Sequence, residues 1–402
     1  MTRTVLMITV LSGLLAVTGR LHAQPLTEIE AVRLGLEAAA LRDWSDASLR
    51  QARSRTLAAG RMQNPEFEFS DESLDLPGGN TERYYWLRQP LDLTGRRGLE
   101  RKSARAAEGL TSAEIEQVKR RRATSIRQLF YQALRLRREH EAMAEWQARL
   151  ALLVVAVSER VEAGDASSFD RLRIERELAL LDSRLATRRA EQVAARQRLF
   201  GLLGSAPRAL TGTLLPGPAP AVSELAAALA RHPELQRLQA GAEADRYAAQ
   251  AAARESWPEF TVGVGVRQFE DAALSQTGGV FSVGVELPLF DRGQQRRDAA
   301  NAGAGAKSAE AALLRVRLEA QARALLEERE SRRKAAEALR DDIGDGANTL
   351  PEMAEAAYRA GEMGVMALID AWQTEMQLRL QAVELEHAAR VAAIELLHLT
   401  GE

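Results

Sequence analysis

The chain has 402 residues, of which 46% are hydrophobic and 27% are charged. This composition is too polar for a bundle of membrane helices and too apolar for a disordered chain, so we expect a folded protein. The 54 Lys and Arg residues nearly balance the 56 Asp and Glu residues, which leaves no field to draw the chain to nucleic acid. The count of 0 cysteines excludes disulfides, zinc-thiolate sites, cysteine nucleophiles and a lipidated N-terminal cysteine.

Residues 1–23 have the pattern of a secretory signal peptide. Arg3 supplies a positive n-region, and the stretch from Val5 to Val17 is an apolar h-region that is too short to span a bilayer. We expect export and cleavage after Ala23, with an uncleaved anchor as the alternative. No later stretch reaches the roughly 18–20 consecutive apolar residues of a spanning helix, so entry into a membrane would have to use strands.

The chain is internally duplicated with an offset of about 195 residues. Four landmarks recur in the same order: Asn64-Pro65-Glu66-Phe67 with Trp257-Pro258-Glu259-Phe260, Gln89-Pro90-Leu91-Asp92-Leu93-Thr94-Gly95 with Leu287-Pro288-Leu289-Phe290-Asp291-Arg292-Gly293, Ala163-Gly164-Asp165 with Ala360-Gly361-Glu362, and Leu199-Phe200-Gly201 with Leu396-Leu397-His398. We therefore predict a first repeat over 24–206, a proline-rich linker over 207–220 and a second repeat over 221–402.

Each repeat contains two segments in which apolar residues alternate with polar or small ones. The pattern is clearest over about 258–269 and 279–288 and weaker over about 65–71 and 83–90. A length of nine or ten residues with one apolar face is typical of a transmembrane β-strand. Gly263 and Gly265 lie inside the alternation, so we interpret them as small residues on the lumen side rather than as a nucleotide-binding loop.

The remaining sequence is rich in Ala, Leu, Glu and Arg and predicts helices. The stretch from Gly98 to Val157 is nearly free of proline and glycine, and about 60 residues at 1.5 Å rise would reach roughly 90 Å. Such a length is typical of coiled coils and tunnels, with turns at Gly164 and Gly361 that fold each repeat into an antiparallel helical hairpin. We expect the three helical tryptophans, Trp44, Trp146 and Trp372, to be core anchors.

Two strands per repeat give four per chain, which are too few to close a barrel, because even small barrels need about eight. An open edge in lipid leaves backbone groups unpaired, at a cost of several kcal/mol each, so the edge strands must pair with other copies. The strand pattern thus predicts a ring of identical chains, and three chains would form a barrel of twelve strands with an aqueous lumen.

The duplicated motifs resemble those of the TolC-type outer-membrane efflux channels, especially the CzcC-like heavy-metal branch. The residues that carry the resemblance are Asn64-Pro65-Glu66, Gln89-Pro90-Leu91-Asp92-Leu93-Thr94-Gly95-Arg96-Arg97, Gly265-Val266-Arg267-Gln268-Phe269-Glu270-Asp271 and Leu287-Pro288-Leu289-Phe290-Asp291-Arg292-Gly293. The resemblance covers the whole mature chain. It implies a mainly α-helical homotrimer with a 12-stranded β-barrel in outer-membrane lipid and a helical tunnel in the periplasm. It also implies a periplasmic adaptor, or membrane fusion protein, and an inner-membrane RND-type transporter as partners.

The resemblance also implies candidate site residues near the two hairpin turns. Asp170 and Asp370 match aspartates that line the closed periplasmic aperture of these channels and favour cations, whereas Ala367 replaces a further family aspartate. The alternative is that both are ordinary solvated helix charges. Gly164, Asp165, Gly361 and Glu362 are expected to face the adaptor, and the alternative for them is a tight-turn glycine followed by a capping acid.

Other functional classes have weaker support in the sequence. None of the five histidines shares the i, i+4 spacing of a helical zinc pair, and no nucleophile constellation or carboxylate pair predicts an enzyme. We expect no cofactor. The main alternative is a periplasmic helical scaffold or adaptor that never enters the outer membrane. The sequence therefore favours a passive export channel, and it leaves open whether the cargo is heavy-metal cations or organic compounds.

Overall fold

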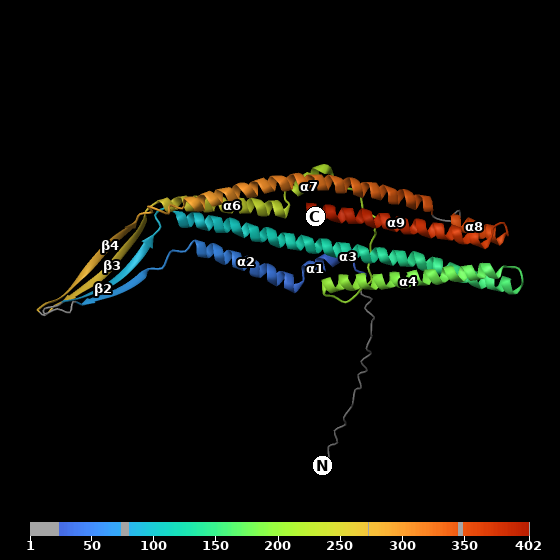
Figure 1. Ribbon diagram of the computed structural model, residues 1–402, viewed down its shortest axis with the longest axis horizontal. Coiled ribbons are helices and arrows are strands. Elements are labelled where there is room, and N and C mark those ends of the chain that lie inside the picture. The colour runs from blue at the N-terminus through green and yellow to red at the C-terminus, as the bar shows by residue number, and fades with distance from the viewer. Residues whose placement is uncertain (1–23, 74–79, 272, 345–348, 402) are drawn as a thin grey trace, which may run out of the picture.

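A small sheet at one end of the molecule continues into long helices that run to the other end (Figure 1). The computed structural model describes residues 24–73, 80–271, 273–344 and 349–401. The signal peptide predicted for 1–23 lies outside these residues. The mostly helical chain with a small antiparallel sheet confirms the predicted fold class.

The segments predicted as the two repeats each contain short helices, a pair of antiparallel strands and long antiparallel helices. The first repeat comprises α1 (Glu28–Leu36), α2 (Ala39–Ala59), β1 (Glu66–Ser73), β2 (Thr81–Leu91), α3 (Arg96–Glu162) and α4 (Ser168–Leu203). The second comprises α5 (Val222–Leu229), α6 (Pro233–Ala253), the 3-10 helix η1 (Arg254–Ser256), β3 (Glu259–Glu270), β4 (Ser275–Glu286), α7 (Gln294–Ile343), α8 (Leu350–Arg359) and α9 (Val365–Thr400). In the described part of the chain, no helix has the length and apolar character needed to cross a membrane.

The helices pack side by side in the same order as the strands that they join. Helices α2 and α4 pack on α3, α3 packs on α6 and α9, and these two pack on α7. The sheet has the order β1-β2-β3-β4. Helix α2 leads into the edge strand β1, and α7 follows the other edge strand, β4. These two helices therefore lie on opposite edges of the molecule.

A buried cluster near the middle of the molecule joins both repeats. It includes Phe130 and Leu134 of α3, Leu199 of α4 and Ile394 of α9, together with Leu210 and Leu214 from the segment between the repeats. This segment, predicted as a linker over 207–220, is held against the helices by arginines. Arg390 donates to the carbonyl of Leu214 at 2.9 Å and Arg137 to that of Leu210 at 2.7 Å. Hydrogen bonds to otherwise unpaired carbonyls thus fix a segment whose prolines cannot form a helix.

Two of the three predicted core tryptophans are buried. Trp146 and Trp372 are 4% and 6% exposed and belong to one apolar cluster between α3 and α9. The prediction for Trp44 is wrong, because its side chain is 42% exposed while its neighbours Leu41 and Ser45 take the buried face of α2.

His232 is the N-cap residue of α6, and its environment leads us to expect that the stability of the fold decreases in acid. Its Nδ1 accepts a hydrogen bond from the Glu234 backbone N–H at 3.2 Å, and burial, with the Arg120 charge second, lowers its pKa to about 4. The folded state therefore excludes a proton that the unfolded chain binds below its ordinary pKa near 6.5. This contribution to stability is present above that value and is lost as the pH falls toward 4, by about 2–3 kcal/mol.

Replacing His232 by Asn tests this expectation, because Asn keeps the N-cap acceptor but does not titrate. We expect the free energy of unfolding, measured with guanidinium in detergent, to fall less between pH 7 and pH 4.5 in His232→Asn than in the parent chain. A His140→Gln variant serves as the control for loss of a histidine. An equal pH dependence in parent and His232→Asn proteins would contradict the prediction.

Candidate functional site

The four-stranded sheet has one apolar face. Directly opposed residues on neighbouring strands share a face, so the register places Phe67, Leu87, Val264 and Phe281 in a single row. All four are exposed, Phe281 by 70%. An exposed apolar face of this kind needs an apolar environment outside the chain.

The opposite face of the sheet is polar. Glu68 of β1 forms an ion pair with Arg88 of β2, and Glu82 accepts a hydrogen bond from Arg267 of β3 at 2.7 Å. These pairs join strands of both repeats across the β1-β2-β3 part of the sheet. The polar face therefore suits contact with water.

The glycines in β3 allow Trp86 to lie against the strand. A Cβ on Gly265 would lie 2.4 Å from the Tyr85 carbonyl oxygen and 3.0 Å from the Trp86 ring, and one on Gly263 would lie 3.5 Å from the same ring. Gly263 and Gly265, which we interpreted as small residues on the lumen side, thus make room for the Trp86 ring on the polar face.

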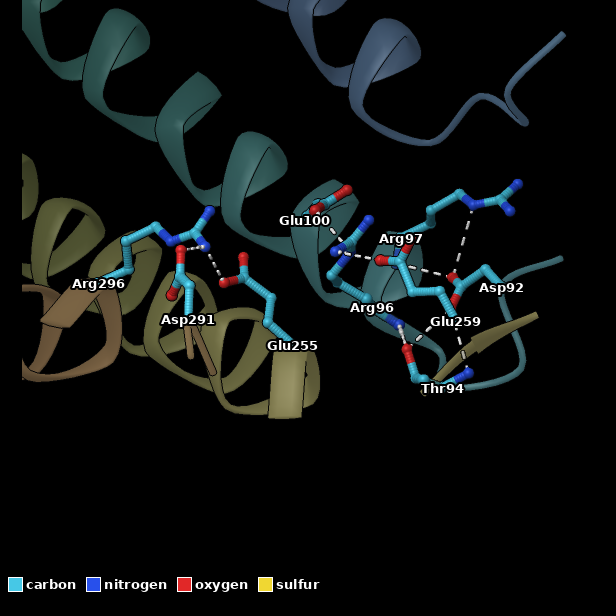
Figure 2. A network of polar contacts seen from close by, with 9 residues as sticks. All are labelled: Asp92, Thr94, Arg96, Arg97, Glu100, Glu255, Glu259, Asp291 and Arg296. Atoms are coloured by element: carbon cyan, nitrogen blue, oxygen red, sulfur yellow. Dashed lines mark hydrogen bonds and ion pairs between the residues drawn. The ribbon is translucent and has the colours of Figure 1, made fainter. Parts of the chain in front are cut away.

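The first strand-to-helix junction is built around Asp92 (Figure 2). Its carboxylate accepts hydrogen bonds from the backbone N–H groups of Thr94 and Arg97 at 3.1 and 3.0 Å, and from the Thr94 hydroxyl at 2.9 Å. Burial alone would raise the pKa of Asp92, but these hydrogen bonds and the Arg97 charge lower it below its ordinary value. Arg96 then reaches Glu259 at the start of β3 at 2.8 Å, which joins the repeats.

The second junction repeats this arrangement with different partners (Figure 2). Asp291 accepts a hydrogen bond from the Gly293 N–H at 2.9 Å, and Arg296 bridges Asp291 and Glu255 at 2.9 and 2.7 Å. Gly95 and Gly293 have φ values of 72° and 71°, the left-handed region that favours glycine. The duplicated motif therefore sets the change of direction from strand to helix at both junctions.

The two hairpin turns have the same backbone hydrogen bonds. The Asp165 N–H donates to the Arg160 carbonyl at 2.7 Å, and the Glu362 N–H donates to the Ala357 carbonyl at 2.9 Å. Gly164 and Gly361 have φ values of 84° and 75°. These are Schellman turns, and their tips lie at the end of the molecule away from the sheet (Figure 1).

Asp170 and Asp370 lie just beyond these turns on the two returning helices. Asp170 is half-buried in the first turn of α4, and Asp370 is exposed in the second turn of α9. Among the described residues, neither carboxylate forms an ion pair. Both side chains thus lie near the hairpin end of the molecule, one on each returning helix.

Polar contacts hold the two hairpins together beside these aspartates. Arg160 donates to the Tyr358 hydroxyl at 3.2 Å, and Gln373 donates to Glu177 at 2.7 Å. The first contact is exposed and the second is half-buried, and each contributes about 1 kcal/mol to holding the hairpins side by side.

No group of three or more His, Asp and Glu side chains in the described residues is arranged to hold a metal ion. His232 and His398 both line a cavity of about 660 Å³ between α3, α6, α7 and α9. Burial lowers the pKa of His398, and its Nδ1 lies 3.0 Å from the Thr124 hydroxyl. This contact joins α9 to α3 beside the cavity.

Solved channel structures share this architecture over almost the whole chain. CusC has a TM-score of 0.77 and 17% identity, with 93% of this chain and 91% of CusC covered. The CmeC outer-membrane channel of Campylobacter jejuni has a TM-score of 0.74 and 12% identity, with 93% and 85% covered. The chain has the fold of the TolC-type outer-membrane channels.

The chain also has a relative in sequence, which supports the resemblance to CzcC-like proteins. The cobalt-zinc-cadmium resistance protein CzcC of Cupriavidus metallidurans is 27% identical over 300 residues, which cover 73% of this chain and 70% of CzcC. No family model matches the chain. The resemblance to TolC-type and CzcC-like proteins predicted from the motifs is thus confirmed.

Sequence reasoning missed the polar network that joins strands to helices in this TolC-type fold. The order of Asp, Gly and Arg that the two predicted repeats share was visible as a motif, but the partners of those residues were not. Glu255 and Glu259 contact Arg296 and Arg96 only because the tertiary structure places β3 between the two junctions.

Proposed function

We propose that this protein is the outer-membrane channel subunit of a tripartite, RND-type efflux system. The observation that carries the proposal is a sheet with an exposed apolar face and two edge strands, joined by rigid junctions to long helical hairpins. The sheet lies in the outer membrane, and the helices extend into the periplasm. The chain acts as a passive conduit and supplies no catalytic group.

The channel is a homotrimer. The edge strands β1 and β4 leave backbone groups that lipid cannot satisfy, so each pairs with a neighbouring copy, and three copies close a barrel of twelve strands. The apolar face then contacts outer-membrane lipid, and the polar face lines the lumen.

The hairpin turns at Gly164, Asp165, Gly361 and Glu362 contact the periplasmic adaptor, which joins the channel to the inner-membrane RND transporter. The cargo consists of heavy-metal cations, a proposal supported by the likeness to the cobalt-zinc-cadmium resistance protein CzcC. Membrane fractionation tests the location. Recovery of the mature chain in the soluble periplasmic fraction would instead favour a helical scaffold or adaptor.

Asp170 and Asp370 form acidic rings at the periplasmic aperture, because the symmetry of the trimer multiplies each charge by the number of copies. Single-channel recordings of Asp170→Ala and Asp370→Ala are expected to show a reduced preference for cations and a changed conductance. Asp182→Ala, on an exposed part of α4 farther from the turn, is the control. Unchanged conductance and selectivity in both aperture variants would reject the role.

A further inference from the structure

A cavity of about 300 Å³ lies between α5, α7, α9 and the segment that joins the two repeats. Three prolines of this segment, Pro216, Pro218 and Pro220, form part of its wall together with Leu225 of α5. Residues 217–219 border the cavity and are exposed, so a ligand can reach it from water. Its volume is at the lower end of the range of small-molecule sites, roughly 300–1,000 Å³.

Arg329 of α7 lines this cavity with a charged side chain that is only 4% exposed. Its Nη2 donates to the Gly217 carbonyl and, at 2.9 Å, to the Pro218 carbonyl. Its Nη1 is buried and has no hydrogen-bond partner among the residues that the structure describes. A buried guanidinium nitrogen normally donates to an acceptor, because it has lost its hydrogen bonds to water. Arg329 therefore has a donor for an acceptor that the described part of the chain does not supply.

A second arginine, Arg390 of α9, lines the same cavity. Its guanidinium group lies over the Tyr131 ring, with Cζ 4.5 Å from the ring centroid. Both arginines donate to backbone carbonyls, and neither forms an ion pair with a carboxylate of the described residues. Burial is the main cause that lowers the pKa of Arg329, and the Arg390 charge also lowers it. The two positive charges are thus close enough to repel each other.

Glu224 also lines the cavity, but its carboxylate is engaged at the start of α5. This exposed carboxylate accepts a hydrogen bond from the Ala221 backbone N–H at 3.3 Å and so caps the helix. Water screens such a group, which limits its effect on a buried arginine. Two positive side chains and one negative side chain therefore line the cavity, which leaves an excess of one positive charge.

We propose that this cavity binds a small amphipathic carboxylate, with its charged group at Arg329 and Arg390 and its apolar body against the prolines and Leu225. Guanidinium groups bind carboxylates strongly, and the backbone carbonyls use only part of the five N–H donors of each arginine. One negative charge matches the excess of one positive charge. A phosphate dianion would exceed it and would lose more hydration between apolar walls. The site is separate from the sheet and the hairpin turns, so it goes beyond the proposed export function.

Equilibrium dialysis of radiolabelled benzoate against the full-length protein in detergent tests the proposal, with protein-free detergent as the blank. Benzoate carries one carboxylate on an apolar ring. We expect saturable binding of about one benzoate per chain, as one cavity requires, and at least tenfold weaker displacement by benzyl alcohol, acetate or inorganic phosphate than by unlabelled benzoate. These competitors lack the charge, the apolar body, or both the apolar body and the single carboxylate. Equal displacement by any of them, or no saturable binding, would overturn the proposal.

Two variants locate the bound benzoate. Ala228→Leu fills the cavity from α5 without changing either arginine, and Arg329→Gln removes the buried charge. We expect each to weaken benzoate binding at least tenfold. The matched controls are Ala226→Leu, at an exposed position of α5, and Arg323→Gln, whose side chain is 81% exposed on α7, and both should bind benzoate as the parent chain does.

Arg329 also holds the segment between the repeats, so Arg329→Gln could lose its fold. Ala228→Leu keeps the test decisive in that case, and parent-like binding by Ala228→Leu would reject the site. Weakening as large in Ala226→Leu as in Ala228→Leu would reject it as well. Dialysis does not require the protein to conduct ions, so failure of the proposed channel function would leave this result unaffected.

Discussion

Phe130→Ala is expected to lower the free energy of unfolding by about 3–5 kcal/mol, because removing a fully buried ring loses its transfer free energy and leaves a cavity. Phe130 is 0% exposed and lies in the cluster that joins α1, α3, α4, α9 and the segment between the repeats. Its ring packs edge-on against Tyr131 with centroids 5.2 Å apart. Guanidinium denaturation of the detergent-solubilised protein measures the loss.

Phe169→Ala is the matched control for this substitution. Phe169 is 68% exposed in the first turn of α4, so the same chemical change removes little buried area there. We expect a change within about 0.5 kcal/mol, as for most surface substitutions. Equal effects of the two variants would contradict the assignment of Phe130 to the shared core.

Gly293→Ala is expected to cost about 4 kcal/mol or more, because two separate effects act at the second junction. The residue has a φ of 71°, which disfavours any side chain. A Cβ there would also lie 2.3 Å from the Ala252 carbonyl oxygen and 2.5 Å from the Glu255 carboxylate. Neither the helix end nor the half-buried Glu255 carboxylate that pairs with Arg296 can move without disturbing the junction. The amount of folded protein in the outer membrane and its denaturation midpoint measure the effect.

Gly95→Ala provides the internal comparison at the first junction. Its φ is 72°, nearly that of Gly293, but an added Cβ there would have no atom within 4 Å. Only the backbone penalty of about 1–2 kcal/mol is expected. If Gly95→Ala proved as damaging as Gly293→Ala, the clash with Ala252 would not be the cause of the loss.

The turn geometry was predictable from the sequence because it depends on local chemistry. Gly164 and Gly361 end long helices with a left-handed residue, and only neighbouring backbone groups satisfy the last carbonyls. The strands were predictable for a similar reason, because apolar residues alternate with polar or small ones when one face of a strand meets an apolar environment. The sequence did not predict the start of β4, which lies at Ser275 and not near 279. Its first three residues, Ser275, Gln276 and Thr277, are polar and join the sheet only by pairing with β3.

The sequence by itself determined the duplication and the period of each element, since these are properties of the local residue pattern. Only the tertiary structure decided that Trp44 lies on an exposed face, that Arg96 bonds Glu259, and that arginines fix the segment between the repeats. Each of these depends on elements far apart in the chain, whose side chains meet only after the helices have packed. Local periodicity can assign residues to a face of a helix, but it cannot say what lies opposite that face.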